Sequence, residues 1–160
     1  MKRGTTLFLK IAVILIGIPI LALCIFFVPE MASFAAQLYP NITYMKYFVF
    51  IDMYATAVPF YVALYQAFKL LGYIDKNQAF SVFSVTALKK IKYCAIIISL
   101  LYVVGMPLFY LIAEKDDAPG IIVIGMVIIF ASMVIAVFAA VLQKLLKEAI
   151  HIKSENDLTV

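Results

Sequence analysis

The sequence predicts an all-α integral membrane protein, a four-helix bundle with a cytoplasmic amphipathic helix between its second and third transmembrane helices. Apolar residues make up 66% of the 160 residues and charged residues 14%, whereas soluble domains are nearer to half apolar and one quarter charged. The charged residues also cluster between long apolar runs, as expected of membrane spans separated by loops. The chain has room for a single membrane domain, residues 1–160, which ends in a cytoplasmic tail, residues 144–160.

Four apolar segments are long enough to cross a hydrocarbon core of about 30 Å at 1.5 Å per residue. We place the spans at residues 8–29, 47–68, 93–113 and 118–143. The third and fourth contain no charged residue, and the first contains one lysine near its start. The second contains one acid, Asp52.

Small residues recur every four positions in the last two spans, at Ala95 and Ser99 and at Ser132, Ala136 and Ala140. Such spacing lets helix backbones approach closely inside a membrane, where hydrophobicity cannot drive helices together. We therefore expect these residues to lie at contacts between helices.

Three prolines, Pro19, Pro59 and Pro107, lie inside the predicted spans. Each removes a backbone donor, so kinks are expected there, most clearly at the Gly-Met-Pro stretch of residues 105–107. Prolines are common in membrane helices, and a purely structural role is the simpler interpretation.

Lysine and arginine are distributed unequally between the two sides of the predicted membrane domain. The N-terminal segment, the loop between spans two and three, and the tail hold eleven of the 13 basic residues. Only Lys46 and Lys115 fall on the other side. The positive-inside rule therefore predicts that both termini and the central loop lie in the cytoplasm.

Asp52 is an intramembrane polar residue, and such residues are candidates for functional sites because a carboxylate in hydrocarbon is costly. It follows Tyr47 by five residues, about 8 Å along a helix, so water or a tyrosine hydroxyl near the outer surface could reach it. Two interpretations remain open. Asp52 is a solvated or hydrogen-bonded structural acid, or it serves an external ligand, proton or ion.

The central loop, residues 75–93, has helical periodicity after its opening turn, with apolar residues on one face and lysines off that face. This pattern is typical of an amphipathic helix on the membrane surface. Ser81 is suited to cap it by accepting a hydrogen bond from an amide of the first turn. The segment is either a lead-in to the third span or a docking site for a partner; the candidate contacts are Phe80, Ser81, Lys89, Lys90 and Lys92.

The tail ends in the polar stretch SENDLTV, residues 154–160, and a helix ending near Ser154 would leave it extended. An extended strip could add to a sheet edge or place its carboxylate in a pocket of another protein. It could instead pack on the lysines of the central loop, or fray as termini commonly do. The candidate partner-binding residues here are Glu155, Asn156, Asp157, Leu158, Thr159 and Val160.

The order of spans, the loop sequence DKNQAFSVFSVTALKKIKY and the closing ENDLTV resemble the YoaS-like family of small bacterial membrane proteins, whose activity is not established. The resemblance extends over the whole chain. It implies a bacterial plasma-membrane protein. Since genes of such proteins commonly stand beside one for a small helix-turn-helix regulator, it also implies such a regulator as a partner.

The leading functional hypothesis is therefore a membrane-anchored binding partner or sensor for a small cytoplasmic helix-turn-helix regulator. The alternative is a small transporter or channel subunit, assembled as a homo-oligomer, that uses Asp52. The expected partners are the lipid bilayer and that regulator, without direct contact to nucleic acid. The only histidine, His151, has no metal-ligand cluster near it, and no catalytic motif is present, so we predict no enzyme, no metal site and no cofactor.

Overall fold

The computed structural model describes residues 3–41, 44–117 and 119–159, and within these ranges it contains four α-helices and no strand. The helices are α1 (Arg3–Leu38), α2 (Met45–Asp75), α3 (Val82–Asp116) and α4 (Gly120–Thr159). All four are long and apolar enough to cross a membrane. The predicted fold class, an all-helical protein with four membrane helices, is confirmed. The first three helices extend beyond their predicted spans at both ends, and α4 begins two residues late and extends 16 residues beyond the end of its span.

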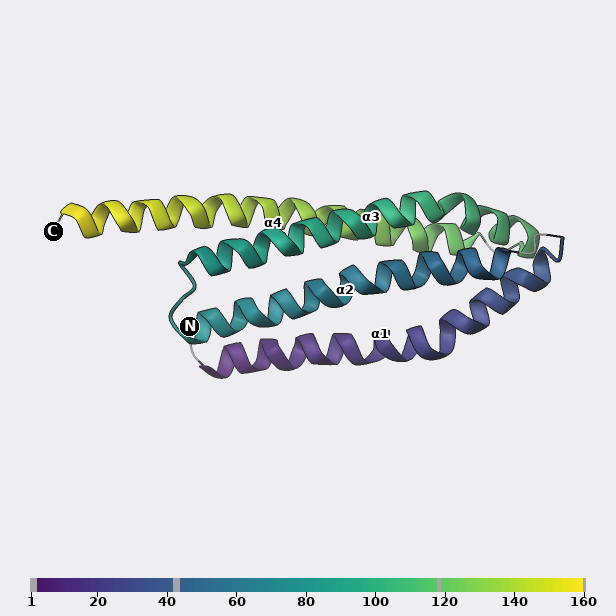
Figure 1. Cartoon of the computed structure of the whole chain (residues 1–160), viewed down its shortest axis with the longest axis horizontal. Coiled ribbons are helices and arrows are strands. Elements are labelled where there is room, and N and C mark those ends of the chain that lie inside the picture. Colours follow the sequence, from purple (N-terminus) through teal and green to yellow (C-terminus); the bar gives the residue numbers. More distant parts are fainter. Residues whose placement is uncertain (1–2, 42–43, 118, 160) are drawn as a thin grey trace.

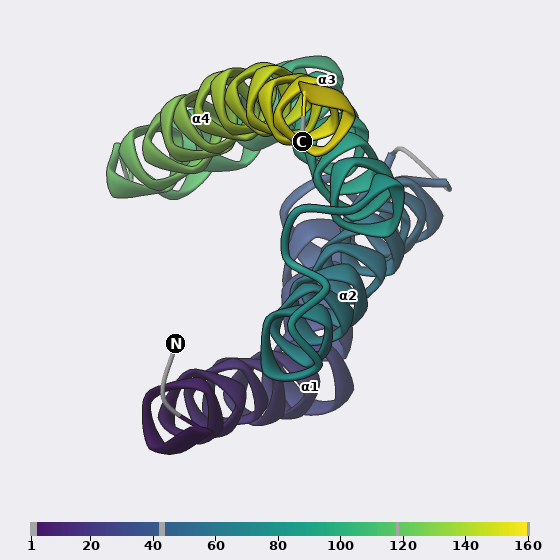
Figure 2. The same ribbon diagram turned by 90° about the vertical axis from the view of Figure 1, so that its left-hand side faces the viewer.

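Each helix packs on the next one in the chain, and neighbours run antiparallel (Figure 1). The most extensive contact joins α3 and α4, and α1 also touches α3 slightly. Within the described residues α4 contacts only α3, so the first and last helices do not meet. Figure 2 shows the result, a curved row of helices with an open side between α1 and α4.

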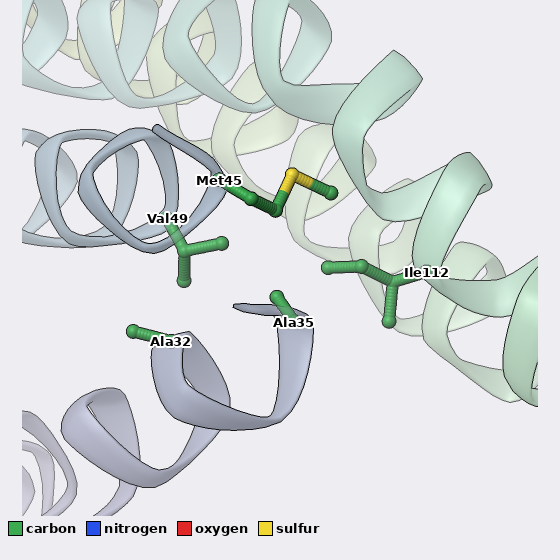
Figure 3. Packing of buried hydrophobic residues seen from close by; sticks show 5 residues of the cluster. All are labelled: Ala32, Ala35, Met45, Val49 and Ile112. Carbon is green, nitrogen blue, oxygen red and sulfur yellow. The ribbon is translucent and has the colours of Figure 1, made fainter. Parts of the chain in front are cut away.

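The best-buried apolar cluster joins the first three helices near the α1–α2 connection. Ala32 and Ala35 of α1 face Met45 and Val49 of α2 and Ile112 of α3 (Figure 3). The alanines present no bulk beyond a methyl group, so α1 can approach α2 closely while the larger side chains fill the remaining space.

Tyrosine hydroxyls strengthen the contact between α1 and α2 inside the spans. Tyr54 donates a hydrogen bond to the Cys24 carbonyl oxygen at 2.9 Å, and Tyr61 donates one to the Gly17 carbonyl oxygen at 2.8 Å. A buried hydroxyl within hydrocarbon needs such a partner, and helix carbonyls can accept a second bond.

Of the five small residues of α3 and α4 that were predicted to lie at contacts between helices, four are buried. Buried positions on the two helices include Ala95, Ser99, Ser132 and Ala136. Because α4 contacts no other helix in the described part of the chain, its buried residues pack against α3. Ala140 is only partly buried, and Ala139 beside it occupies the next buried position instead.

The helices continue through Pro19, Pro59 and Pro107. The clearest change of direction in Figure 1 is in the second half of α1, which contains Pro29. This proline was placed at the end of the predicted first span. It lies inside α1 instead, where its ring and its missing donor favour a bend.

A separate amphipathic helix between the second and third spans is not supported. Residues 82–116 form one continuous helix, and its first turns bury Val85, Ala87 and Leu88. No glycine or proline interrupts residues 82–104. The predicted apolar face is divided: Ala87 and Leu88 are buried in the protein, whereas Phe80 and Phe83 are exposed. Ser81 does cap this helix, as predicted: its hydroxyl oxygen accepts a hydrogen bond from the Ser84 amide at 3.4 Å.

The prediction of an extended tail after Ser154 is wrong. Helix α4 continues to Thr159, and Val160 lies outside the described residues. Residues 144–159 contain neither glycine nor proline to end the helix, and His151 and Glu155 pair one turn apart at 3.0 Å. Sheet-edge addition by an extended strip therefore does not apply to this conformation.

We predict that Ala136→Leu destabilises the protein by about 1–3 kcal/mol, because three added carbons must enter the close contact between α3 and α4. Loss of helical circular dichroism on denaturation of the detergent-solubilised protein measures the effect. Ala22→Leu is the matched control, since Ala22 of α1 is exposed. Equal stability of the two variants would contradict close packing at Ala136.

Candidate functional site

Most lysines of the described chain gather at one end of the molecule, where α2 ends, α3 begins and both termini lie (Figure 1). We call this end the basic end. Its described lysines are Lys10, Lys69, Lys76, Lys89, Lys90, Lys92, Lys144, Lys147 and Lys153. Lys46 and Lys115 lie toward the opposite end, so the charge asymmetry of the sequence is also an asymmetry of the fold.

The connection between α2 and α3 exposes three apolar side chains at the basic end, Phe80, Val82 and Phe83. We call these three residues the connection patch. Ser81, a predicted contact, is instead engaged locally: besides capping α3, its hydroxyl donates a hydrogen bond to the Gln78 carbonyl oxygen at 2.6 Å. Its role in the structure is to begin the helix.

The three predicted lysines at the start of α3 differ in their surroundings. Lys89 and Lys90 are exposed. Lys92 donates a hydrogen bond to the Gln143 side-chain oxygen at 3.2 Å, and its amine also lies 4.9 Å from the centre of the Tyr93 ring. Gln143 is buried, so Lys92 contributes to the packing of α3 on α4.

The predicted tail residues Glu155 to Thr159 occupy the last turns of α4, which extend past the ends of the other three helices (Figure 1). Glu155, Asn156, Asp157 and Leu158 are exposed. The structure does not bring the tail acids against the lysines of α3, since no ion pair joins them in the described part of the chain. Packing of the tail on the central loop is thus not observed.

An ion pair that the sequence analysis did not identify joins α1 to α2 at the basic end. The Lys10 amine lies 2.8 Å from a carboxylate oxygen of Asp75, and both side chains are largely buried. The same amine lies 5.5 Å from the centre of the Phe68 ring. Only the register between the two helices identifies this pair, because 65 residues separate its members.

Asp52 lies in the contact between α2 and α3, against the backbone of Gly105. A Cβ at Gly105 would come within 2.6 Å of the Asp52 Oδ2 atom. That oxygen is buried and has no hydrogen-bond partner among the described residues. The absence of a side chain at Gly105 thus provides the space that the carboxylate occupies. Asp52 lies within a predicted membrane span, where an unpaired charge is costly.

A groove of about 770 Å³ lies between the helices, and residues of all four helices line it. Its walls are mostly alanine, isoleucine, leucine and phenylalanine side chains. Thr56, Tyr102 and Ser132 are the hydroxyl-bearing residues of the wall. A mostly apolar hollow of this size with a few polar groups has the usual character of a site for a small molecule.

The described residues contain no group of three or more histidine, cysteine or acidic side chains that could hold a metal ion. Cys24 and Cys94 are both unbridged. The chemistry of the groove and the basic end is therefore that of apolar contact, hydrogen bonding and charge.

Comparison with known proteins supports the resemblance drawn from the sequence. The family model described as "Protein of unknown function (DUF2975)" matches residues 30–160. A protein of Bacillus subtilis (strain 168) described as "Uncharacterized membrane protein YoaS" is 76% identical over 160 residues, which is the full length of both chains. No solved structure matches the chain. The comparisons and the four apolar helices agree on a multi-pass membrane protein whose helices contact the lipid bilayer.

We predict that the effect of Gly105→Ala on stability depends on Asp52. In the parent chain the new methyl group displaces the Asp52 carboxylate, and we expect the free energy of unfolding to fall by about 1–3 kcal/mol. In an Asp52→Ala background the carboxylate is absent and the new methyl group has room. Because alanine has a better helix propensity than glycine, we expect the free energy of unfolding to stay the same or to rise by up to about 1 kcal/mol.

Denaturation of the four proteins of this cycle, followed by circular dichroism, measures the coupling. Gly72→Ala is the control for propensity alone, because a Cβ there meets nothing within 4 Å. Additive effects of the two substitutions would contradict the contact between Asp52 and Gly105.

Proposed function

The chain belongs to the family described as proteins of unknown function (DUF2975), and from this premise we propose that it is a membrane-anchored binding protein for a cytoplasmic protein. The observation that carries the proposal is the length of α4. With 40 residues the helix is about 60 Å long, twice the thickness of the hydrocarbon core. Its last turns leave the helical array as an isolated, solvated helix.

The projecting part of α4 combines charged and apolar side chains. Ile152 is 60% exposed and Leu158 is 83% exposed, among lysines and acids that keep the helix soluble. A solvated helix whose apolar side chains meet no other part of its own chain is a suitable ligand for a groove on another protein. The connection patch lies at the same end and extends the apolar surface available to a partner.

The cytoplasmic side follows from charge. Eleven of the 13 basic residues belong to the segments that meet at the basic end. Short segments rich in lysine and arginine are seldom translocated across a bacterial plasma membrane. We therefore propose that the basic end, with both termini, faces the cytoplasm. A partner recruited there is a cytoplasmic protein.

The partner we propose is the small helix-turn-helix regulator that the family resemblance implies. Docking on the α4 end would hold that regulator at the membrane, away from DNA, without contact between this chain and nucleic acid. Among the lysines of this end, Glu155 and Asp157 in the last turns of α4 are the exposed acids that would pair with a basic surface of the docked protein. The role is proposed to be non-catalytic and to need no cofactor.

A small oligomeric transporter or channel subunit is the second candidate. The buried Asp52 oxygen without a hydrogen-bond partner supports it, because polar groups inside spans commonly mark ion or substrate pathways. Four helices without an internal repeat provide a limited scaffold for alternating access, so we rank this candidate second.

We predict that Ile152→Asp lowers capture of the regulator by at least tenfold when the full-length chain and an epitope-tagged regulator are co-expressed and purified in mild detergent. The added charge would have to be buried, unpaired, in an apolar contact. Quantitative immunoblotting of the regulator in the purified fraction measures the loss.

Tyr44→Asp is the matched control, because it places the same acid on an exposed aromatic residue at the opposite end of the molecule. Capture that survives Ile152→Asp would exclude α4 as the docking element. If the parent chain does not capture the regulator, the proposed identity of the partner is wrong.

A further inference from the structure

The groove has walls from all four helices but opens on one side. Its lining includes Ile20 of α1, Phe60 of α2, Tyr102 of α3 and Ile128 of α4. Since α1 and α4 do not contact each other within the described residues, no helix closes the groove between them, in agreement with the open side seen in Figure 2. The groove therefore opens sideways, at the depth of the spans, toward the bilayer.

The size and lining of the groove define the body of its occupant. A volume of about 770 Å³ lies within the range of sites for single small molecules and is too small for a further transmembrane helix. The walls are almost wholly apolar, so water gains few hydrogen bonds there and a hydrocarbon gains dispersion contacts. A molecule dissolved in the bilayer can enter without crossing the polar ends of the protein.

The polar groups of the wall indicate which kind of polar group a ligand of the groove would carry. The Thr56 hydroxyl donates its proton to the Met53 carbonyl oxygen at 2.8 Å, so toward a ligand it can act only as an acceptor. Tyr102 of α3 also lines the groove. This part of the wall is thus suited to a ligand that donates hydrogen bonds.

An acid lies behind the part of the wall that Thr56 forms, although it is not itself one of the lining residues. Asp52 lies one helical turn before Thr56, and its Oδ2 atom is buried without a hydrogen-bond partner in the described chain. Among the residues that the structure describes, no lysine or arginine lines the groove. Glu30, another acid within a long apolar helix, borders a separate shallow hollow on the outside of α1. No cation among the described residues of this wall holds the charge of the Asp52 carboxyl group. A positive charge in the groove beside Thr56 would favour the ionised form of Asp52 and be attracted by it in a medium of low dielectric constant.

We propose that the groove is a binding site for an amphiphilic monocation, with its hydrocarbon body among the apolar side chains and its ammonium group beside Thr56 and Tyr102, facing Asp52. Charge complementarity selects this class over fatty acids, whose carboxylate the ionised Asp52 repels, and over neutral lipids, which can donate a hydrogen bond but lack the attraction between opposite charges. The inference concerns binding and does not rest on the proposed cytoplasmic partner.

The test compares two ligands of equal chain length, radiolabelled dodecylammonium and the neutral dodecanol, on the full-length protein in phosphatidylcholine nanodiscs, with empty nanodiscs subtracted. We expect saturable binding of dodecylammonium. Asp52→Asn, which keeps the shape of the side chain and removes its charge, is expected to weaken dodecylammonium about tenfold and to leave dodecanol unchanged.

Ala131→Phe fills the groove from an exposed position of α4 and is expected to abolish saturable binding of dodecylammonium. Ala22→Phe adds the same ring on an exposed site of α1 outside the lining and is expected to bind as the parent does. Circular dichroism verifies folding of each variant. If Ala131→Phe does not fold, Ile135→Trp provides the same test, since Ile135 is a half-exposed residue of the lining.

Three results would overturn the proposal: no saturable binding of dodecylammonium, equal affinity of the parent and Asp52→Asn for it, or full binding by the groove-filling variants. Cross-linked dimers that form without ligand and are lost in Ala131→Phe would assign the groove to a second copy of the chain instead. Loss of partner capture alone would leave this site unaffected.

Discussion

The hydrocarbon core of a bilayer offers the peptide backbone no hydrogen-bond partner, and this constraint determines most of the structure. A crossing segment must satisfy its own amide and carbonyl groups, which only a helix does within one chain segment. The same requirement extends to side chains. Tyr54 and Tyr61 donate to carbonyl oxygens of α1, and Thr56 donates to a carbonyl oxygen of its own helix. The two tyrosine hydrogen bonds thus fix the position of α2 relative to α1, which apolar contacts alone would define less well.

The constraint also divides the molecule into two regions with different chemistry. Most charged side chains lie where the helices leave the core, and the basic end is the larger of the two collections. There the helix ends carry an ion pair, Lys10 with Asp75, and a lysine–glutamine hydrogen bond between α3 and α4. Inside the core the open row of helices leaves an apolar groove with one acid behind its wall. Recognition of proteins is proposed for the first region and of an amphiphile for the second.

The sequence predicted what depends on residues near one another in the chain. Four apolar runs predicted four helices, and small residues four positions apart predicted buried positions between α3 and α4. A serine before an amphipathic stretch predicted the cap of α3. The sequence did not predict the full length of the helices, because apolar periodicity marks the spans but not where solvated turns end. The contacts of Asp52 with Gly105 and of Lys10 with Asp75 depend on the register of two helices, and the groove depends on the separation of α1 from α4. None of these follows from local pattern.

Orientation links the fold to the proposed recruitment of a cytoplasmic protein, and one labelling experiment tests it directly. In a chain carrying Cys24→Ala and Cys94→Ala, single cysteines are introduced as Ser154→Cys on the solvated end of α4 and as Tyr44→Cys at the opposite end, both at exposed positions. A membrane-impermeant maleimide applied to intact cells should modify the cysteine at position 44 and reach the one at position 154 only after the membrane is permeabilised. Modification of position 154 in intact cells, with position 44 protected, would place the basic end outside the cell and contradict the account.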